Sequence, residues 1–176
     1  KQELLKYEIL SAVTIVNGII KQESDINVTK KKAIEILSNA RFLNGSGYFF
    51  AYENGGSTYK FAFHGTKPHL NGKTTNINKP DIKGYAFRKA LIDSAKDDNK
   101  FIEYYYKKPN SDKLMKKIAF SKYIPELNWV VVTGIYIDDI EKKINALEKE
   151  SNESLNSLIY TLIGFTLAIL LLLIII

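Results

Sequence analysis

Cysteine is absent from the 176 residues of this chain. Its absence excludes disulfide bonds, thiol catalysis, and zinc or iron–sulfur sites built on cysteine ligands. Histidine is also scarce, because only His64 and His69 occur. These two side chains, with no cluster of carboxylates beside them, do not supply the three or four ligands that zinc requires. We therefore predict no metal site and no cofactor.

The common catalytic motifs are missing as well. The chain contains no P-loop, no dinucleotide-binding glycine motif, no nucleophile elbow and no zinc-protease helix motif. Gly45-Ser46-Gly47 resembles a fragment of a phosphate loop, but we expect a strand after it rather than a helix. We predict no catalytic residues and no enzymatic activity.

Arginine is rare although the chain is basic. Among 25 basic residues only Arg41 and Arg88 are arginine, and the formal net charge is +6. Proteins that read nucleic acids tend to use arginine forks and a concentrated basic stripe. The lysines here are spread along the whole chain, which is typical of a solvated surface. We predict no nucleic-acid partner.

Charged residues are absent from the last part of the chain. Residues 158–176 form a run of 19 without a charge, and about 20 apolar residues are enough to cross a bilayer. A buried core helix of this length would carry a polar face, whereas only Thr161 and Thr166 interrupt the run. We predict a transmembrane helix over 158–176. Because the chain begins with Lys1 rather than Met, we also expect it to be part of a longer protein.

Hydrophobic periodicity predicts an α+β domain ahead of this helix. Apolar residues three and four apart indicate helices over 3–22, from an N-cap at Thr29 to Arg41, and over 81–98, and the first two could also be one bent helix. Aromatic and β-branched runs between turn residues indicate five strands, at 48–52, 58–63, 101–106, 115–123 and 128–136. Successive hairpins favour an antiparallel five-stranded sheet with helices on one face.

Two connecting segments are also informative. Residues 64–78 read as a long loop, and a loop of that length is usually functional or mobile. After the last strand, apolar residues alternate at spacings of four and three toward the membrane run, as in a coiled coil weakened by Ser151 and Ser154. This stripe and the N-terminal helix predict a homodimer.

Six short motifs occur in order between Thr29 and Ile140. They are Arg41-Phe42 with Gly47-Tyr48-Phe49-Phe50; His64 with Pro68, Leu70 and Gly72-Lys73; Gly84; Phe101 to Tyr104; Lys107 and Pro109 with Lys117; and Trp129-Val130-Val131 with Thr133 to Ile140. In this order they resemble the single Cache (sCache) sensor domain of bacterial membrane receptors. The corresponding patterns of that family read RY…GYFF, HP…P…L…GK, DG, GFVEY, KP…K and GW…TGVYVDDI.

The resemblance implies a PAS-like extracytoplasmic sensor domain between two membrane helices, the first of which would precede Lys1. Four segments follow: an N-terminal dimerisation helix (1–28), the ligand-binding domain (29–140), a juxtamembrane helix (141–157) and the transmembrane helix (158–176). The implied location is the inner membrane, with the sensor domain in the periplasm or outside the cell. The implied function is ligand sensing, foremost in a methyl-accepting chemotaxis protein, and the implied ligand is a small carboxylate such as acetate, propionate, pyruvate or lactate.

A carboxylate that leaves water requires charged or strong hydrogen-bond donors in its pocket. We predict that Arg41 or Lys117 carries the anion, although Arg41 could instead bind the carbonyl groups at its helix end. His64 and Lys67 are further predicted donors from the loop, and His64 could equally be exposed to solvent.

Aromatic residues supply the predicted wall of the pocket. Tyr48 and Phe50 share one strand face, as do Tyr104 and Tyr106 on another strand, because side chains alternate along a strand. An ordinary hydrophobic core is the alternative for each of them. We expect Arg88 on a solvated helix face.

Three positions depart from the family pattern and bear on the choice of ligand. Gly65 stands in place of Pro, Tyr106 in place of Trp, and Phe120 in place of Tyr. Other functions also stay open. The domain could serve a histidine kinase or a diguanylate cyclase, or it could be a membrane-anchored protein-interaction module without a small-molecule ligand.

Overall fold

The computed structural model describes residues 2–109, 111 and 113–175, with the side chains of 139–141, 168 and 171–175 left aside. The chain divides into two units, Lys1–Asp139 and Ile140–Ile176. The elements in chain order are α1 (Gln2–Gln22), α2 (Ile26–Asn39), β1 (Arg41–Phe42), β2 (Gly47–Asn54), β3 (Tyr59–His64), η1 (Pro68–Leu70), β4 (Thr74–Thr75), α3 (Phe87–Ser94), β5 (Ile102–Lys107), β6 (Leu114–Ile124), η2 (Pro125–Leu127), β7 (Trp129–Tyr136) and α4 (Ile137–Ile175).

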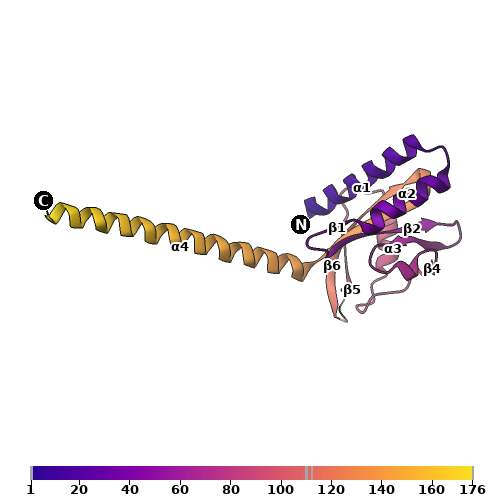
Figure 1. Ribbon diagram of the computed structural model, residues 1–176. Coiled ribbons are helices and arrows are strands. Elements are labelled where there is room, and N and C mark those ends of the chain that lie inside the picture. Colours follow the sequence, from indigo (N-terminus) through magenta and orange to yellow (C-terminus); the bar gives the residue numbers. More distant parts are fainter. Residues whose placement is uncertain (1, 110, 112, 176) are drawn as a thin grey trace. The chain divides into compact units, whose positions relative to one another are not determined.

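The first unit is built on one antiparallel sheet with the order β4-β3-β2-β7-β6-β5, and β1 pairs with β2. The sheet contains the five strands that the sequence predicts, together with β1 and β4 of two residues each. Helices α1 and α2 lie along one side of the sheet, and α3 lies on the other (Figure 1). The predicted α+β fold is confirmed, and the sheet is covered on both faces rather than one.

The N-terminal helices bury one stripe each against the sheet. In α1 the buried residues are Leu5, Ile9, Ala12 and Val16, and in α2 they are Thr29, Ala33 and Leu37. These spacings of three and four residues are those of a helix with one apolar face. The two helices are separate, because residues 23–25 between them are not helical.

The predicted start of the second helix is wrong by four residues. Asp25 is the N-cap, and its carboxylate accepts a hydrogen bond from the Asn27 amide at 2.8 Å. Aspartate is among the best N-cap residues, and its charge also favours the positive end of the helix dipole. Thr29 lies inside the helix, where its hydroxyl donates to the Asp25 carbonyl.

The third predicted helix is also shorter than expected, because 81–86 form a turn rather than helix. The Asp81 carboxylate accepts hydrogen bonds from the amides of Lys83 and Tyr85 and, across to β5, from the amide of Tyr105. Gly84 has a φ of 83°, which the helix cannot contain. Helix α3 therefore begins only at Phe87.

Helix α4 begins at the residue that follows β7 and continues to Ile175. Its described apolar side chains between Leu158 and Leu170 are exposed. Within the part of the chain that the structure describes, no helix is long and apolar enough to cross a membrane. The predicted span at 158–176 includes side chains that lie outside the described residues, and it stays a prediction.

Candidate functional site

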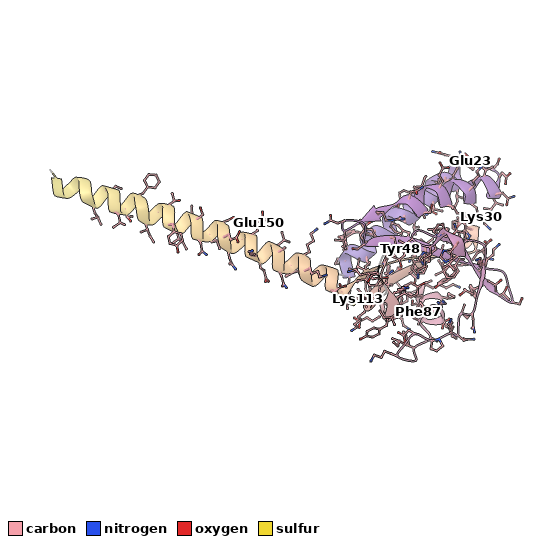
Figure 2. The ribbon with its side chains drawn as sticks, turned by 60° about the horizontal axis from the view of Figure 1, so that its bottom comes forward. Glu23, Lys30, Tyr48, Phe87, Lys113 and Glu150 are labelled. Atoms are coloured by element: carbon pink, nitrogen blue, oxygen red, sulfur yellow. The ribbon has the colours of Figure 1, made fainter. Side chains whose placement is uncertain are left out.

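A small cavity lies between the sheet and α3. Its volume is about 10 Å³, enough for a single water molecule. Seven aromatic rings and one imidazole line it: Tyr48, Phe50 and Tyr52 of β2, Phe61 and His64 of β3, Phe87 of α3, and Tyr104 and Tyr106 of β5. Tyr48 and Phe87, both labelled in Figure 2, come from the sheet and the helix that enclose it. The predicted residues Tyr48, Phe50, His64, Tyr104 and Tyr106 thus meet in one wall.

Ring contacts hold α3 over the edge of the sheet. The rings of Phe87 and Tyr104 are stacked with centroids 4.2 Å apart and an interplanar angle of 5°. Tyr106 meets Phe87 edge-on at 5.8 Å. Aromatic pairs in such arrangements stabilise the fold by more than the burial of their surface area alone. Phe87 was not among the predicted site residues, although its spacing from Leu91 and Ala95 by fours would have placed it on the buried face of the helix.

Lys117 is a cation buried beside this cavity. Its side chain is 0% exposed, and Nζ has no hydrogen-bond partner in the described structure. The ammonium lies 3.9 Å from the centroid of the Tyr48 ring and 5.6 Å from that of Phe50. Burial, and then the charge on Lys67, lowers the pKa of Lys117 from 10.5 to about 7. The cation–π contact with Tyr48 is its main compensation.

Glycine at position 134 makes room for this lysine. Lys117 pairs with Tyr136 on β7, and Gly134 lies two pairs further along, opposite Ala119 and on the same face of the sheet. A Cβ atom at Gly134 would lie 2.7 Å from Cε of Lys117 and 2.8 Å from the Ile118 carbonyl oxygen. Any larger residue would push the lysine stem out of its place. Gly134 is therefore a site residue that the predicted set lacks.

His64 is buried and neutral. Its ring stacks on Phe50 with centroids 5.3 Å apart. Burial, and then the charges on Lys117 and Lys67, lower the pKa of His64 to about 3. Nδ1 accepts a hydrogen bond from the Thr66 amide at 3.3 Å, so Nε2 carries the proton. The predicted alternative of a solvent-exposed His64 is wrong, because the side chain is buried. Its role as a donor to a ligand stays a prediction, and the neutral imidazole has one N–H to donate.

The tyrosine hydroxyls of the site also stay protonated. Burial raises the pKa of Tyr48, whose hydroxyl is hydrogen-bonded to Tyr136 and Thr66. Burial likewise raises the pKa of Tyr104. The cavity therefore combines neutral hydroxyl and imidazole donors with a single buried amine.

Lys67 lies at the rim of the cavity. Its ammonium donates to the Tyr106 hydroxyl at 3.3 Å and lies 4.3 Å from the centroid of the same ring. The two cations Lys67 and Lys117 thus approach the aromatic wall from different elements. Their mutual repulsion contributes to the lowered pKa of Lys117.

Arg41 is occupied by backbone carbonyl groups. Its guanidinium donates to the carbonyls of Ser38 at 2.8 Å and Ala40 at 2.7 Å, and also to that of Gly65. This is the helix-end role that the sequence left open for it, and Arg41 does not line the cavity. It ties the end of α2 to the turn that follows His64.

Arg88 is not on a freely solvated face, contrary to the prediction. Its guanidinium lies 4.4 Å from the centroid of the Phe87 ring and donates to the Lys79 carbonyl. Its Nε is buried without a partner in the described structure. The charge on Arg88 also acts on the buried Tyr52 hydroxyl at the far end of β2.

The described residues contain no group of three or more His, Cys, Asp or Glu side chains that could hold a metal ion. The donors of the site are an amine, an imidazole and hydroxyl groups. Such a set suits an oxyanion or a carbonyl compound better than a cation.

Comparison with known proteins gives a consistent family. A family model of the Cache domain matches residues 1–165. The chain is 24% identical over 170 residues to the methyl-accepting chemotaxis protein CtpM of Pseudomonas aeruginosa and 27% identical over 139 residues to the sensor histidine kinase MctS of Rhizobium johnstonii. These matches cover 93% and 78% of this chain but 29% of each relative. The chain thus spans less than a third of the length of these curated relatives.

Solved structures agree with this assignment. A methyl-accepting chemotaxis protein from Vibrio parahaemolyticus is 33% identical, with a TM-score of 0.68, and the match covers 78% of this chain and 89% of that one. A Cache chemosensory domain, whose structure explains its recognition of carboxylic acids, is 19% identical with a TM-score of 0.64 and covers 78% of this chain and 93% of its own. The second likeness concerns the fold alone.

Proposed function

Because the chain belongs to the Cache domain family, we propose that it is the ligand-sensing part of a bacterial transmembrane receptor and binds a small carboxylate beside Lys117. The observation that carries this proposal is the buried amine of Lys117, which has no hydrogen-bond partner among the described residues. An unpaired buried cation is costly, and an entering carboxylate would supply the missing partner. The related Cache domain that recognises carboxylic acids supports this choice of ligand.

The geometry favours Lys117 over Arg41 as the anion carrier. Arg41 is engaged by three carbonyl groups, whereas Lys117 has no hydrogen-bond partner among the described residues and lies against aromatic rings near the charge on Lys67. A carboxylate on Lys117 would also reach the proton on Nε2 of His64. Phe50, Tyr104 and Tyr106 would enclose the apolar end of acetate, propionate, pyruvate or lactate. Lys67 would lie at the entrance of the pocket, where its charge attracts anions.

Ligand binding must enlarge the cavity, because about 10 Å³ does not hold even acetate. The wall that can yield is the one formed by α3, which has only eight residues, and by the edge strand β5. We expect the ring stack of Phe87 and Tyr104 to separate from the sheet on binding. A ligand shifts such an equilibrium only by its difference in affinity for the two states.

The receptor context is part of the same proposal. We place residues 158–176 in the inner membrane and the first unit in the periplasm or outside the cell, because the described side chains of that run are apolar and exposed. A homodimer is supported by exposed apolar residues on α1, such as Tyr7 and Leu10, and on α4, such as Leu147. Chemotaxis is the first candidate output, and the kinase MctS supports a sensor kinase as the second.

Thermal unfolding of the full chain in detergent tests the carboxylate. Trp129, the single tryptophan, is buried and reports unfolding by fluorescence. A ligand at 100 times its dissociation constant adds about 2.7 kcal/mol, which corresponds to a rise in Tm of roughly 5–10 °C. Acetate, propionate, pyruvate and lactate are compared with acetamide, which has the shape of acetate without its charge.

The expected result is a rise with at least one carboxylate that acetamide does not reproduce and that Lys117→Met abolishes. Arg41→Ala should keep the rise. The proposal is wrong if no carboxylate shifts the Tm, or if Lys117→Met responds as the native chain does.

A further inference from the structure

We propose that Lys117 is also a reactive amine, which forms a reversible imine with small carbonyl compounds, above all 2-oxo acids. The inference rests on the proposed function in one respect, since the carbonyl compound would enter through the same cavity. It goes beyond that function because the bond is covalent and because an uncharged aldehyde could also form it.

The surroundings of the amine favour its neutral form. Aromatic rings face it at 3.9 Å from Tyr48 and 5.2 Å from Tyr136, and the charge of Lys67 repels a proton on it. No hydrogen bond occupies its nitrogen within the described structure. A lysine desolvated in an apolar pocket near another cation is the arrangement that makes an amine nucleophilic.

The chemical advantage over the other lysines is large. With a pKa of about 7, roughly half of the Lys117 side chains are neutral at pH 7, whereas an ordinary lysine is neutral in about 3 of 10,000 molecules. The reactive fraction is thus roughly 1,000-fold higher at Lys117. This ratio offsets the restricted access to a buried site.

The reaction balances without an oxidant or a reductant. The lone pair of Nζ attacks the carbonyl carbon, and the carbonyl oxygen takes up the proton that the nitrogen loses, which gives a carbinolamine. The hydroxyl then leaves as water and a C=N bond forms. The Tyr48 hydroxyl, which stays protonated and whose ring faces the amine, can lend a proton to the departing hydroxyl. The imine nitrogen then keeps its own proton as a cation or returns it to Tyr48. Hydrolysis reverses each step.

The class of carbonyl compound follows from the donors around the amine. A protonated imine carries a positive charge, as an ammonium group does, and a carboxylate on the adjacent carbon would pair with it. The neutral His64 side chain, with its proton on Nε2, offers that carboxylate a hydrogen bond. The cavity wall is otherwise aromatic. Pyruvate and glyoxylate fit this description better than a longer or branched 2-oxo acid.

Reductive trapping tests the imine. The full chain in detergent is treated with pyruvate and sodium cyanoborohydride at pH 7, and the modified lysines are located by peptide mass spectrometry. We expect Lys117 to gain one carboxyethyl group at least tenfold faster than any other lysine. Lys117→Met should lose this label, whereas Lys32→Met, which removes an exposed lysine of α2, should keep it. Lys117→Arg retains the charge but cannot form an imine.

The pH profile identifies the reactive group. The titratable groups near Lys117 are Tyr48, His64, Lys67 and Tyr136, together with Tyr104, its cross-strand partner on β5. His64, Tyr48 and Tyr104 keep their protonation states between pH 6 and pH 8, because their pKa values lie outside that range. Labelling of Lys117 should rise roughly tenfold from pH 6 to pH 8 and then level off. Labelling of exposed lysines should rise about 100-fold and continue to rise.

The outcomes separate the two proposals. If acetate raises the Tm but the label is spread over surface lysines, the reactive amine is wrong and carboxylate binding stands. If Lys117 is labelled selectively but no carboxylate raises the Tm, carboxylate sensing is wrong and the reactive amine stands. Protection of Lys117 from labelling by acetate would place both ligands on the same nitrogen.

Discussion

Burial of Lys117 should make the stability of the ligand-free protein depend on pH in a defined window. Its pKa is about 7 in the folded state against 10.5 as the ordinary value. Between these two values the unfolded chain binds a proton that the folded chain does not, so the free energy of unfolding rises with pH. The slope is about 1.4 kcal/mol per pH unit. Below pH 7 both states are protonated, and the full cost of burying the charge, about 5 kcal/mol, is present.

Replacing Lys117 with Met removes this dependence and keeps a stem of similar length. We expect Lys117→Met to be more stable than the native chain at pH 7, because a buried unpaired charge is exchanged for an apolar group. The gap in unfolding free energy should shrink by about 2–3 kcal/mol between pH 7 and pH 9 as the native lysine loses its proton. Any difference in packing between the two side chains adds a constant that does not vary with pH.

Denaturant unfolding at pH 7, 8 and 9, followed by Trp129 fluorescence, measures this gap. Subtracting the unfolding free energy of the native chain from that of the variant cancels the contribution of every other group that titrates in both. His64, with its folded-state pKa of about 3, contributes below this range, because its proton is lost from the unfolded chain near pH 6.5. A gap that stays constant from pH 7 to pH 9 would refute the burial of a lysine with a lowered pKa.

Three further substitutions test the supports of the site. Gly134→Ala should displace Lys117 and cost about 1–3 kcal/mol of stability. The control Gly18→Ala, with no atom within 4 Å of its new Cβ, should stabilise α1 by up to about 1 kcal/mol. If both variants lost stability to a similar extent, position 134 would have no special role. Arg41→Ala should lower the Tm through loss of its carbonyl contacts and leave carboxylate affinity unchanged, and a lost affinity would return Arg41 to the site. Asp81→Ala should speed hydrogen exchange at the Tyr105 amide, and unchanged exchange would show that another contact holds this turn.

Much of the cavity could be predicted from local pattern. Alternation along β2 places Tyr48, Phe50 and Tyr52 on one face, and the structure finds all three in the cavity wall. The strand positions followed from turn residues and aromatic runs, because those signals act over a few residues. The start of α3 could not be read in this way. Asp81 ties the preceding turn to Tyr105, which is 24 residues away, and helical periodicity does not register such a bond.

The burial of Lys117 is harder to predict from the sequence than that of the aromatic residues, because Lys117 follows a second lysine, Lys116. Lys116 and Lys117 point to opposite faces of β6, and alternation normally decides which one is buried. In this strand the residues from 117 to 121 are all buried, since α1 covers one face and α3 the other. Lys116 escapes only because it lies toward the end of the strand, where it forms a 2.6 Å ion pair with Glu103. The pairing of β6 with β7, which residues distant in the sequence determine, therefore decides that Lys117 is buried and Lys116 is not.

This placement also explains why Lys117 is the residue on which both proposals depend. Folding alone favours an apolar side chain at a position with 0% exposure, since the charge lowers stability and no partner compensates it. The glycine at 134 adds a second local cost, because it removes a side chain from the middle of an eight-residue strand that is otherwise fully buried. Lys117 and Gly134 thus contact each other, and Cε of the lysine occupies the space that a Cβ at position 134 would fill. The stability of the fold does not explain why two unfavourable residues are placed together. They are expected where a site must hold an amine in an aromatic pocket, and where the ligand restores the lost stability when it binds.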